Sequence, residues 1–197
     1  MGMIAADGYL FCGRGKGKDR KLRYMVRFCD PCPVMRRRFS RLVLSVYGVR
    51  SMSKPSEIVV SAYGKAMAVD LVGSAGFGTH KWTFPVTRMD RNATRAWIRA
   101  YFDGDGDVKM GSRERYAVVR ARSVNLEGLR TVQSALSEQF GVYSRIYRHN
   151  SQHLRWSPAF DLAIIRQADI VRFFRRIGFS HPLKAAKLEA YIRRITS

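Results

Sequence analysis

Three kinds of feature are scarce in this sequence, and each scarcity excludes a class of protein. No apolar run approaches the ~20 residues of a membrane-spanning helix. Residues 1–10 contain Asp7 and lack the basic start of a secretory signal, so we expect no export signal there. Cysteines number only three, at positions 12, 29 and 32. So few thiols, with one left over, do not make a disulfide framework and suit a reducing compartment.

Acidic residues are scarce as well. Asp and Glu total 15 against 36 Lys and Arg, which gives a formal net charge of +21 and a pI of about 10.8. Such an excess attracts polyanions, because basic groups release counterions when they bind phosphates. An anionic membrane surface would need a basic amphipathic helix or a lipid anchor, and the sequence shows neither. A role of the charge in solubility alone is a less favoured explanation than nucleic-acid binding, because the basic residues are spread along the expected strands. Nucleic acid is therefore the expected partner.

The chain divides into two halves of similar plan. Each half opens with a short apolar stretch that ends in an acidic residue and a glycine, at residues 2–8 and again at 100–106. Segments of alternating polarity follow in each half, which is typical of half-buried strands. Several landmarks recur in the same order, so the sequence predicts an internal repeat.

The expected elements follow from these patterns. Hairpins are predicted at 9–16 with 21–28 and at 108–113 with 116–124. Helices over 34–47 and 126–140 should end at Gly48 and Gly141, because glycine favours the left-handed conformation that closes a helix. Further strands are expected at 57–62, 144–149 and 159–165. A helix should close each half, ending at 75–77 in the first and at 177–179 in the second, and a final helix is expected at 183–195. The predicted fold class is α+β, with two pseudo-symmetric α-β-β-α-β-β-α repeats.

The opening stretches carry a resemblance. The second reads Ala100-Tyr101-Phe102-Asp103-Gly104-Asp105-Gly106, and the first, truncated at its start, runs over residues 1–8 to Asp7-Gly8. These residues resemble the motif of the LAGLIDADG homing endonucleases. Two copies, each followed by a basic hairpin, make the resemblance specific, and it covers nearly the whole chain. It implies a first repeat at 1–80, a linker at 81–92, and a second repeat at 93–197 with an extra C-terminal helix.

The resemblance also implies a function. It predicts a monomeric, site-specific endonuclease that cuts both strands of a long duplex target and leaves cohesive ends. Its antiparallel sheets would form a DNA-binding saddle that needs no protein partner. The sequence shows no splicing domain, so we expect an intron-encoded or free-standing protein. The expected compartment is the cytoplasm, in association with the nucleoid, or an organelle matrix.

The motif supplies the candidate catalytic acids, Asp7 and Asp105. Small residues four apart on each motif helix would let the two helices touch and bring these acids together. Two close carboxylates repel, so the pair needs cations, and Mg²⁺ is the first choice among hard divalent ions. In the family the carbonyl before each acid adds a ligand, here those of Ala6 and Gly104. The alternative is a plain Asp-Gly turn. The first copy has Ala5 at the motif position that Asp103 occupies in the second, so that acid cannot be needed in both halves. We therefore interpret Asp103 as a residue with a local structural role.

Basic and polar residues complete the candidate site. The family usually places a basic residue beside the cleaved phosphate, and Lys184 is the candidate for this catalytic role. Lys81, Asp30 and Asn125 are accessory candidates. The residues expected to contact DNA are Arg14, Lys16, Lys18, Arg23, Arg27, Lys109, Arg113, Arg120, Arg122, Arg145 and Arg148. For any single lysine, a phosphate contact without chemistry is the simpler explanation.

Three other interpretations remain to be weighed. Cys29 and Cys32 have the spacing of half a zinc site, but no second cysteine pair exists to complete four ligands. An RNA maturase that uses the same fold to assist intron splicing is one rival function. A DNA-binding regulator that has lost cleavage is the other, and the presence of both motif acids argues against it.

Overall fold

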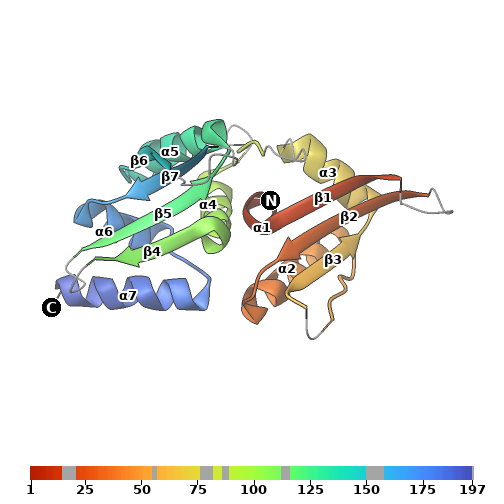
Figure 1. Cartoon of the computed structure of the whole chain (residues 1–197), viewed down its shortest axis with the longest axis horizontal. Coiled ribbons are helices and arrows are strands. Elements are labelled where there is room, and N and C mark those ends of the chain that lie inside the picture. Colours follow the sequence, from red (N-terminus) through yellow and green to blue (C-terminus); the bar gives the residue numbers. More distant parts are fainter. Residues whose placement is uncertain are drawn as a thin grey trace. The chain divides into compact units, whose positions relative to one another are not determined.

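The chain forms two compact units. The computed structural model describes residues 1–14, 21–54, 57–75, 82–85, 89–111, 116–149 and 158–196. One unit consists of Met1 and Met3–Thr83, and the other of Gly2 and Phe84–Ser197. The division between Thr83 and Phe84 falls inside the segment 81–92 that the sequence predicts as a linker. Each unit is an antiparallel sheet with helices, as Figure 1 shows.

The first unit has a three-stranded sheet in the order β1-β2-β3. Its elements are α1 (Gly2–Asp7), β1 (Gly8–Arg14), β2 (Leu22–Cys29), α2 (Pro33–Tyr47), β3 (Val59–Tyr63) and α3 (Lys65–Ala75). Alternate residues of β2, Val26 and Phe28, are buried. The spacing of four in α2 turns Met35, Phe39 and Val43 to the same core, and the rings of Phe28 and Phe39 stack at 5.1 Å.

The second unit has a four-stranded sheet in the order β4-β5-β7-β6. Its elements are α4 (Arg91–Asp105), β4 (Gly106–Met110), β5 (Ala117–Ser123), α5 (Leu126–Phe140), β6 (Arg145–His149), β7 (Ala159–Ile164), α6 (Gln167–Arg176) and α7 (Pro182–Thr196). The core joins alternate strand residues to aromatic side chains of α4 and α6. Phe102 and Phe173, both fully buried, lie with ring centroids 5.1 Å apart.

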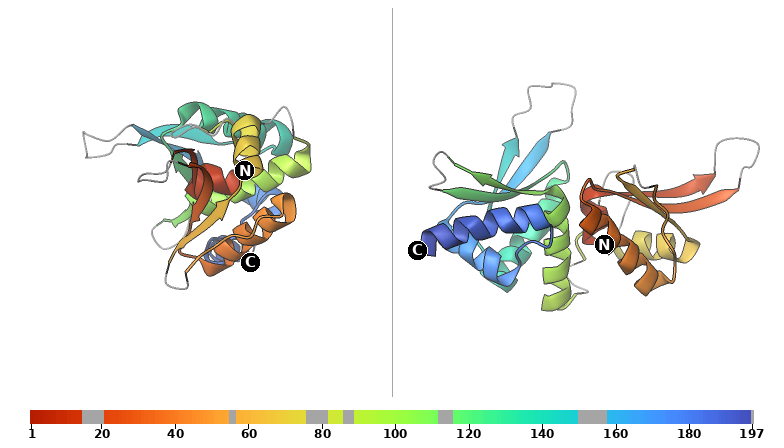
Figure 2. Two further views of the ribbon diagram at one scale, coloured as in Figure 1. Left: turned by 90° about the vertical axis from the view of Figure 1, so that its right-hand side faces the viewer. Right: turned by 90° about the horizontal axis from the view of Figure 1, so that it is seen from below.

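Each sheet has one face covered by helices and one face open. The helices of each unit lie on one side of that unit's sheet, as Figure 2 shows. The burial of β5 alternates accordingly, with Ala117, Val119 and Ala121 buried and the residues between them partly exposed. A sheet with one solvated face needs polar or charged residues there, which is the pattern that the strands carry.

The predicted fold class is confirmed, because the structure is a mixed α+β fold with antiparallel sheets. Both predicted hairpins form, and helices α2 and α5 end where the sequence predicts. Gly48 and Gly141 close them with φ of 65° and 60°, in the left-handed region. The second unit follows the order α-β-β-α-β-β-α, with α7 added after it.

The first unit departs from the full repeat. Its described residues give three named strands, and an isolated antiparallel bridge between Met52 and Ser61 lies next to the third. The chain from the end of α2 at Tyr47 to the start of β3 at Val59 is shorter than the chain from α5 to β7.

The helices of the two units are short. The longest in the described ranges, α2, α4, α5 and α7, have 15 residues each. Within those ranges, none combines the length and the apolar character that crossing a bilayer requires.

Candidate functional site

The two motif acids lie at matching corners, one in each unit. Asp7 is the last residue of α1 and Asp105 the last residue of α4. In both cases the next residue is an extended glycine that begins a strand. Gly8 has φ −98° and ψ 158°, and its N–H donates to the carbonyl of Ile4. Gly106 has φ −84° and ψ 159°, and its N–H donates to the carbonyl of Phe102. The two corners thus match in backbone conformation and in the hydrogen bond that the glycine donates to the residue four positions before it.

Close backbone approach requires the glycine of each corner. A Cβ on Gly8 would lie 2.4 Å from Cα of Ile4, and a Cβ on Gly106 would lie 2.2 Å from the carbonyl oxygen of Phe102. Both contacts are with backbone, which cannot move aside without unwinding the last helical turn. Close packing in the turn therefore explains why each Asp-Gly pair contains a glycine. It does not explain why the residue before the glycine is an acid. Both acids are partly exposed.

Asp103 has the local structural role that the sequence suggested. Its side chain is fully buried, and its Oδ1 accepts hydrogen bonds from the backbone N–H of Ser180 at 2.7 Å and of His181 at 2.9 Å. These residues lead directly into α7, so Asp103 fixes the start of that helix. The first half has no helix equivalent to α7 among its described residues, which explains why Ala5 suffices at the matching position.

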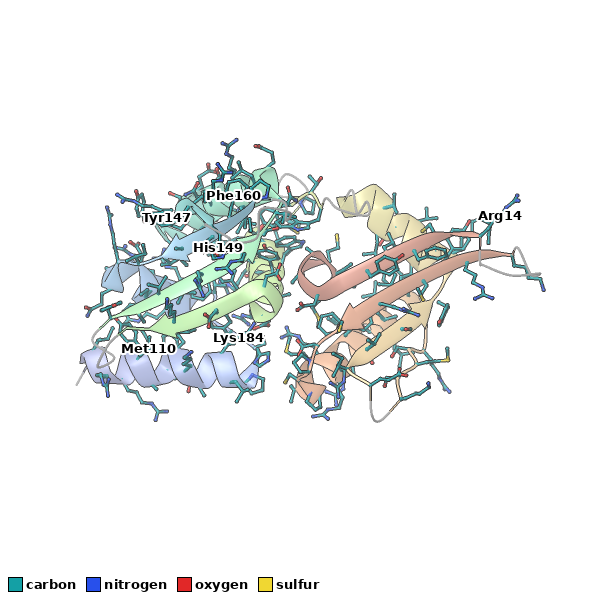
Figure 3. The ribbon with its side chains drawn as sticks, viewed as in Figure 1. Arg14, Met110, Tyr147, His149, Phe160 and Lys184 are labelled. Carbon is teal, nitrogen blue, oxygen red and sulfur yellow. The ribbon has the colours of Figure 1, made fainter. Side chains whose placement is uncertain are left out.

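Lys184 lies at the C-terminal end of the second motif helix. It belongs to the first turn of α7, and its Nζ donates to the carbonyls of Asp103 at 2.5 Å and Gly104 at 2.6 Å, with Phe102 at 3.5 Å. Figure 3 shows Lys184 on α7 next to the start of β4. Carbonyls in the last turn of a helix have no partner inside the helix, and a cation is favoured at that negative end. The fold thus brings Lys184 to the corner that carries Asp105.

The donor atoms at the two corners are oxygens. Asp105 and the Gly104 carbonyl belong to the second unit, and Asp7 and the Ala6 carbonyl to the first. Carboxylate and carbonyl oxygens are the ligands of hard divalent cations such as Mg²⁺. Each corner, taken by itself, therefore offers oxygen donors of the kind that such an ion prefers. Lys81, the other basic candidate, lies outside the described residues.

The open face of the second sheet gathers four of the eleven predicted DNA-contacting residues. Strand register puts Arg120 and Arg122 of β5 on that face, with Lys109 of β4 and Arg145 of β6. Arg148 differs, because it pairs with Phe160 and therefore lies on the helix-covered side of the sheet, at its edge. The structure does not bring Arg148 together with the others. Tyr147 and His149, on the same strand, do share the open face, and Figure 3 labels both.

An acid that the sequence analysis missed lies in the middle of this face. Asp161 of β7 binds Arg122 through two hydrogen bonds, of 2.7 and 3.1 Å, and lies 3.8 Å from Arg120 and 3.5 Å from His149. Its burial alone would raise the pKa of the carboxyl, but the hydrogen bond and the charge of Arg122, with Arg120 and His149, lower the pKa overall. The alternation of Phe160, Asp161 and Leu162 was the signal that could have placed it there.

The open face of the first sheet is less charged. Arg23 and Arg27 of β2 share it with Met25, and strand register adds Tyr9 and Phe11 of β1. Arg14 pairs with Leu22, so it has the opposite orientation and lies at the end of β1, as Figure 3 shows. Three further predicted contacts, Lys16, Lys18 and Arg113, lie outside the described residues.

Asp30 and Asn125 occupy matching places before α2 and α5. Asp30 is buried, and its Oδ1 accepts from the N–H of Cys32 at 2.6 Å. Asn125 caps α5 by accepting from the N–H of Gly128 at 3.1 Å. Both side chains therefore shape a helix start in this structure. Cys29 and Cys32 are free thiols.

Tyr143 and Arg166 are further residues that the sequence analysis missed. Arg166 stacks over the Tyr143 ring at 4.2 Å, and Arg145 donates to the Tyr143 hydroxyl at 3.1 Å. The hydrogen bond and the charge of Arg145 lower the pKa of Tyr143. Together with Tyr147 these side chains line a small hollow where β6 begins and β7 ends. Two arginines and two tyrosines in one hollow form a surface suited to a phosphate or a base.

Comparison with known proteins identifies the class of fold. I-DmoI in complex with DNA and Mn aligns with a TM-score of 0.65 at 15% identity, over 89% of this chain and 92% of that one. The I-LtrWI LAGLIDADG homing endonuclease bound to target DNA aligns at 0.59 and 9%, over 100% and 89%. Full-length DUF199/WhiA from Thermatoga maritima aligns at 0.60 and 18%, over 99% and 57%. The fold is that of LAGLIDADG homing endonucleases.

Sequence comparison adds a match to a family model. Residues 92–178, which include the second motif, match the family model of the LAGLIDADG-like domain. For this half of the chain, the match agrees with the resemblance drawn from the motifs. The chain is also 23% identical over 185 residues to the replication factor C small subunit of Methanocaldococcus jannaschii. The match covers 91% of this chain but spans only about a tenth of the length of that curated relative.

Proposed function

We propose that the protein is a metal-dependent, site-specific DNA endonuclease that cuts both strands of a long duplex target. The observation that carries this proposal is the pair of matching corners at Asp7 and Asp105, each a helix end followed by a required glycine. Solved structures with this fold support it, since they are of I-DmoI in complex with target DNA in the presence of Mg, or with DNA and Mn or Ca.

Each motif residue has a part in this proposal. The carboxylates of Asp7 and Asp105, with the carbonyl of Ala6, would hold divalent cations, Mg²⁺ first. The Gly104 carbonyl accepts from Lys184 at 2.6 Å, so it would join the ligands through its second lone pair. A bound divalent ion supplies an activated water and stabilises the leaving oxygen. Lys184 holds its ammonium beside Asp105 and adds positive charge where the cleaved phosphate develops negative charge. The proposal requires both acids to act on one target, one for each strand, which leaves cohesive ends.

The open sheet faces supply the proposed DNA contacts. A twisted antiparallel sheet presents alternate side chains to a groove, and the major groove admits β-strands. In the second unit these side chains are those of Lys109, Arg120, Arg122 and Arg145, and in the first unit those of Arg23 and Arg27. The protein acts as a monomer in this proposal, and its gene is placed in an intron or stands free.

Binding to DNA should be steeply salt-dependent. The net charge of +21 and the arginines of the open faces imply that several phosphates are neutralised in the complex. We expect log Kd to rise with log salt concentration at a slope of about 4 or more, the value for about five phosphates. Fluorescence anisotropy with a labelled duplex across a salt series measures the slope. A nearly flat dependence would contradict an electrostatic interface.

Arginines of the open faces should carry sequence preference. Replacing Arg23, Arg27 or Arg120 with Ala should relax the choice at one or two base pairs each, because a good bidentate contact contributes about 1–3 kcal/mol of discrimination. Cleavage or binding profiles over a set of target variants measure this. Arg148→Ala is a matched control, since Arg148 lies on the other side of its sheet. Unchanged profiles for all the open-face variants would show that these faces do not read the target.

A selection experiment tests the function. The purified protein is incubated with duplexes that carry a randomised segment, with Mg²⁺ or with a chelator, and the cut ends are sequenced. We expect a single recurring target, cut on both strands only when Mg²⁺ is present. Recovery of bound but uncut duplexes would favour a DNA-binding regulator. Binding to structured RNA, with neither binding nor cutting of duplex DNA, would favour a maturase.

A further inference from the structure

An acidic residue is unexpected at the centre of a surface that attracts polyanions. Asp161 lies on β7, the strand between β5 and β6, and its side chain is only 14% exposed. Strand register places Arg122 and Tyr147 directly beside it on either side. A negative charge here opposes the binding of phosphate, so its presence has to serve another purpose on this face.

The geometry of the Asp161–Arg122 pair indicates that purpose. Nε of Arg122 donates to Oδ1 at 2.7 Å, and Nη2 donates to Oδ2 at 3.1 Å. This pairing uses the side edge of the planar guanidinium and fixes its orientation. The end edge, formed by Nη1 and the second hydrogen of Nη2, keeps its donors. The Arg122 side chain is 41% exposed, so a second pair of acceptors can approach it from solvent.

Arg120 also faces Asp161 and helps to keep its carboxylate charged. Its Nη1 lies 3.8 Å from Oδ2, and Nδ1 of His149 lies 3.5 Å from the same oxygen. Arg120 also lies 3.4 Å from Asp107, which holds it at the β4 side. Asp161 therefore remains an ionised acceptor at neutral pH, and it restrains the long side chain of Arg122 before any ligand arrives. A restrained guanidinium loses less conformational entropy on binding than a mobile one.

We propose that Asp161 is a positioning residue that presents the end edge of Arg122 to the N7 and O6 acceptors of a guanine in duplex DNA. These two acceptors lie side by side in the major groove, and a bidentate arginine is the commonest specific contact to them. The inference rests on the proposed DNA-binding function and deepens it, because it names one base pair type and the residues that select it. Asp161 makes no contact with the base itself.

The proposal predicts two effects of opposite sign for Asp161→Asn. Loss of the negative charge strengthens attraction to phosphates, so binding to an unrelated duplex should tighten about two- to threefold. Loss of the paired acceptor frees Arg122, so discrimination at one G·C pair should fall about tenfold. A damaged fold would instead weaken binding to every duplex.

The test is a set of binding measurements on the whole protein. Dissociation constants are determined for the selected target, for targets with each base pair changed, and for an unrelated duplex. The variants are Asp161→Asn, Arg122→Ala, the double variant, and Arg122→Lys, which keeps the charge but cannot form the two-point pair. Glu127→Gln is the matched control, because it removes one acid from the Glu127–Arg130 pair on α5, away from the sheet.

The double variant decides whether Asp161 acts through Arg122. We expect Asp161→Asn and Arg122→Lys to lose discrimination at the same G·C pair, and Asp161→Asn to have no further effect once Arg122 is Ala. Glu127→Gln should leave the profile unchanged. An equal loss with and without Arg122, or no loss in Asp161→Asn, would overturn the inference. A wild-type protein that binds all duplexes alike would overturn the proposed function as well. That failure can be told apart from a failure of the inference, because it is seen in the wild-type protein before any variant is measured.

Discussion

Asp7→Asn and Asp105→Asn are each expected to reduce double-strand cutting by about 10³-fold or more. Asn keeps the size of the side chain and fits the same helix-to-strand corner, but it lacks the charge that a divalent ion requires. Loss of several kcal/mol of metal-based stabilisation of the transition state corresponds to a rate loss of this order. Single-turnover cleavage of a selected target in Mg²⁺ measures the effect.

Binding should survive in both acid variants. The open sheet faces supply the affinity, and the acids oppose it by repelling phosphate, so Asp7→Asn should bind as well as the wild type or more tightly without metal. Glu127→Gln is the control, since Glu127 pairs with Arg130 on α5 and belongs to neither corner nor to an open sheet face. It should keep cutting. Full cutting by Asp7→Asn or Asp105→Asn would remove that residue from the active site.

Lys184→Met should slow cutting by about 10²-fold, the effect of removing one preorganised donor. It should also lower the free energy of unfolding by about 1 kcal/mol, because the ammonium no longer neutralises the carbonyl end of α4. Met keeps most of the length and the apolar stem of Lys184 without the charge. Cleavage rates and urea denaturation on the same preparations measure the two effects separately.

Lys187→Met is the matched control for Lys184. Lys187 lies one turn further along α7, is half-exposed and approaches Asp107 only at 4.0 Å. It should change neither the rate nor the stability by much, since an exposed pair of this kind contributes little. If Lys184→Met lowers stability while cutting continues at the wild-type rate, Lys184 is a cap for the motif helix and not a catalytic residue.

Local sequence patterns predicted most of the elements. The glycines that end α2 and α5 and the alternation along β2 and β5 are signals carried within a few residues. The same is true of the Asp-Gly corners, where the conformation is set by the preceding helical turn. The first unit departs from the repeat, since its described residues show a single bridge between Met52 and Ser61 where the repeat suggested a strand.

Contacts between distant residues account for what the sequence could not show. Lys184 reaches carbonyls 80 positions away, and Asp103 anchors a loop 77 positions away. Neither pairing has a local signature. Arg148 is different, because its spacing of three from Arg145 already places the two on opposite faces of a strand. The place of Asp161 beside Arg122 could not be predicted, because the sheet register that pairs the two joins strands that are far apart in the sequence.

The most direct test of the account is strand-resolved cleavage of a selected target by the wild-type protein. The duplex is labelled on both strands and incubated with Mg²⁺ or with a chelator, and the products are mapped at single-nucleotide resolution. The account predicts one discrete cut on each strand, offset to give cohesive ends, in Mg²⁺ alone. Tight and specific binding with both strands intact at all Mg²⁺ concentrations would contradict it.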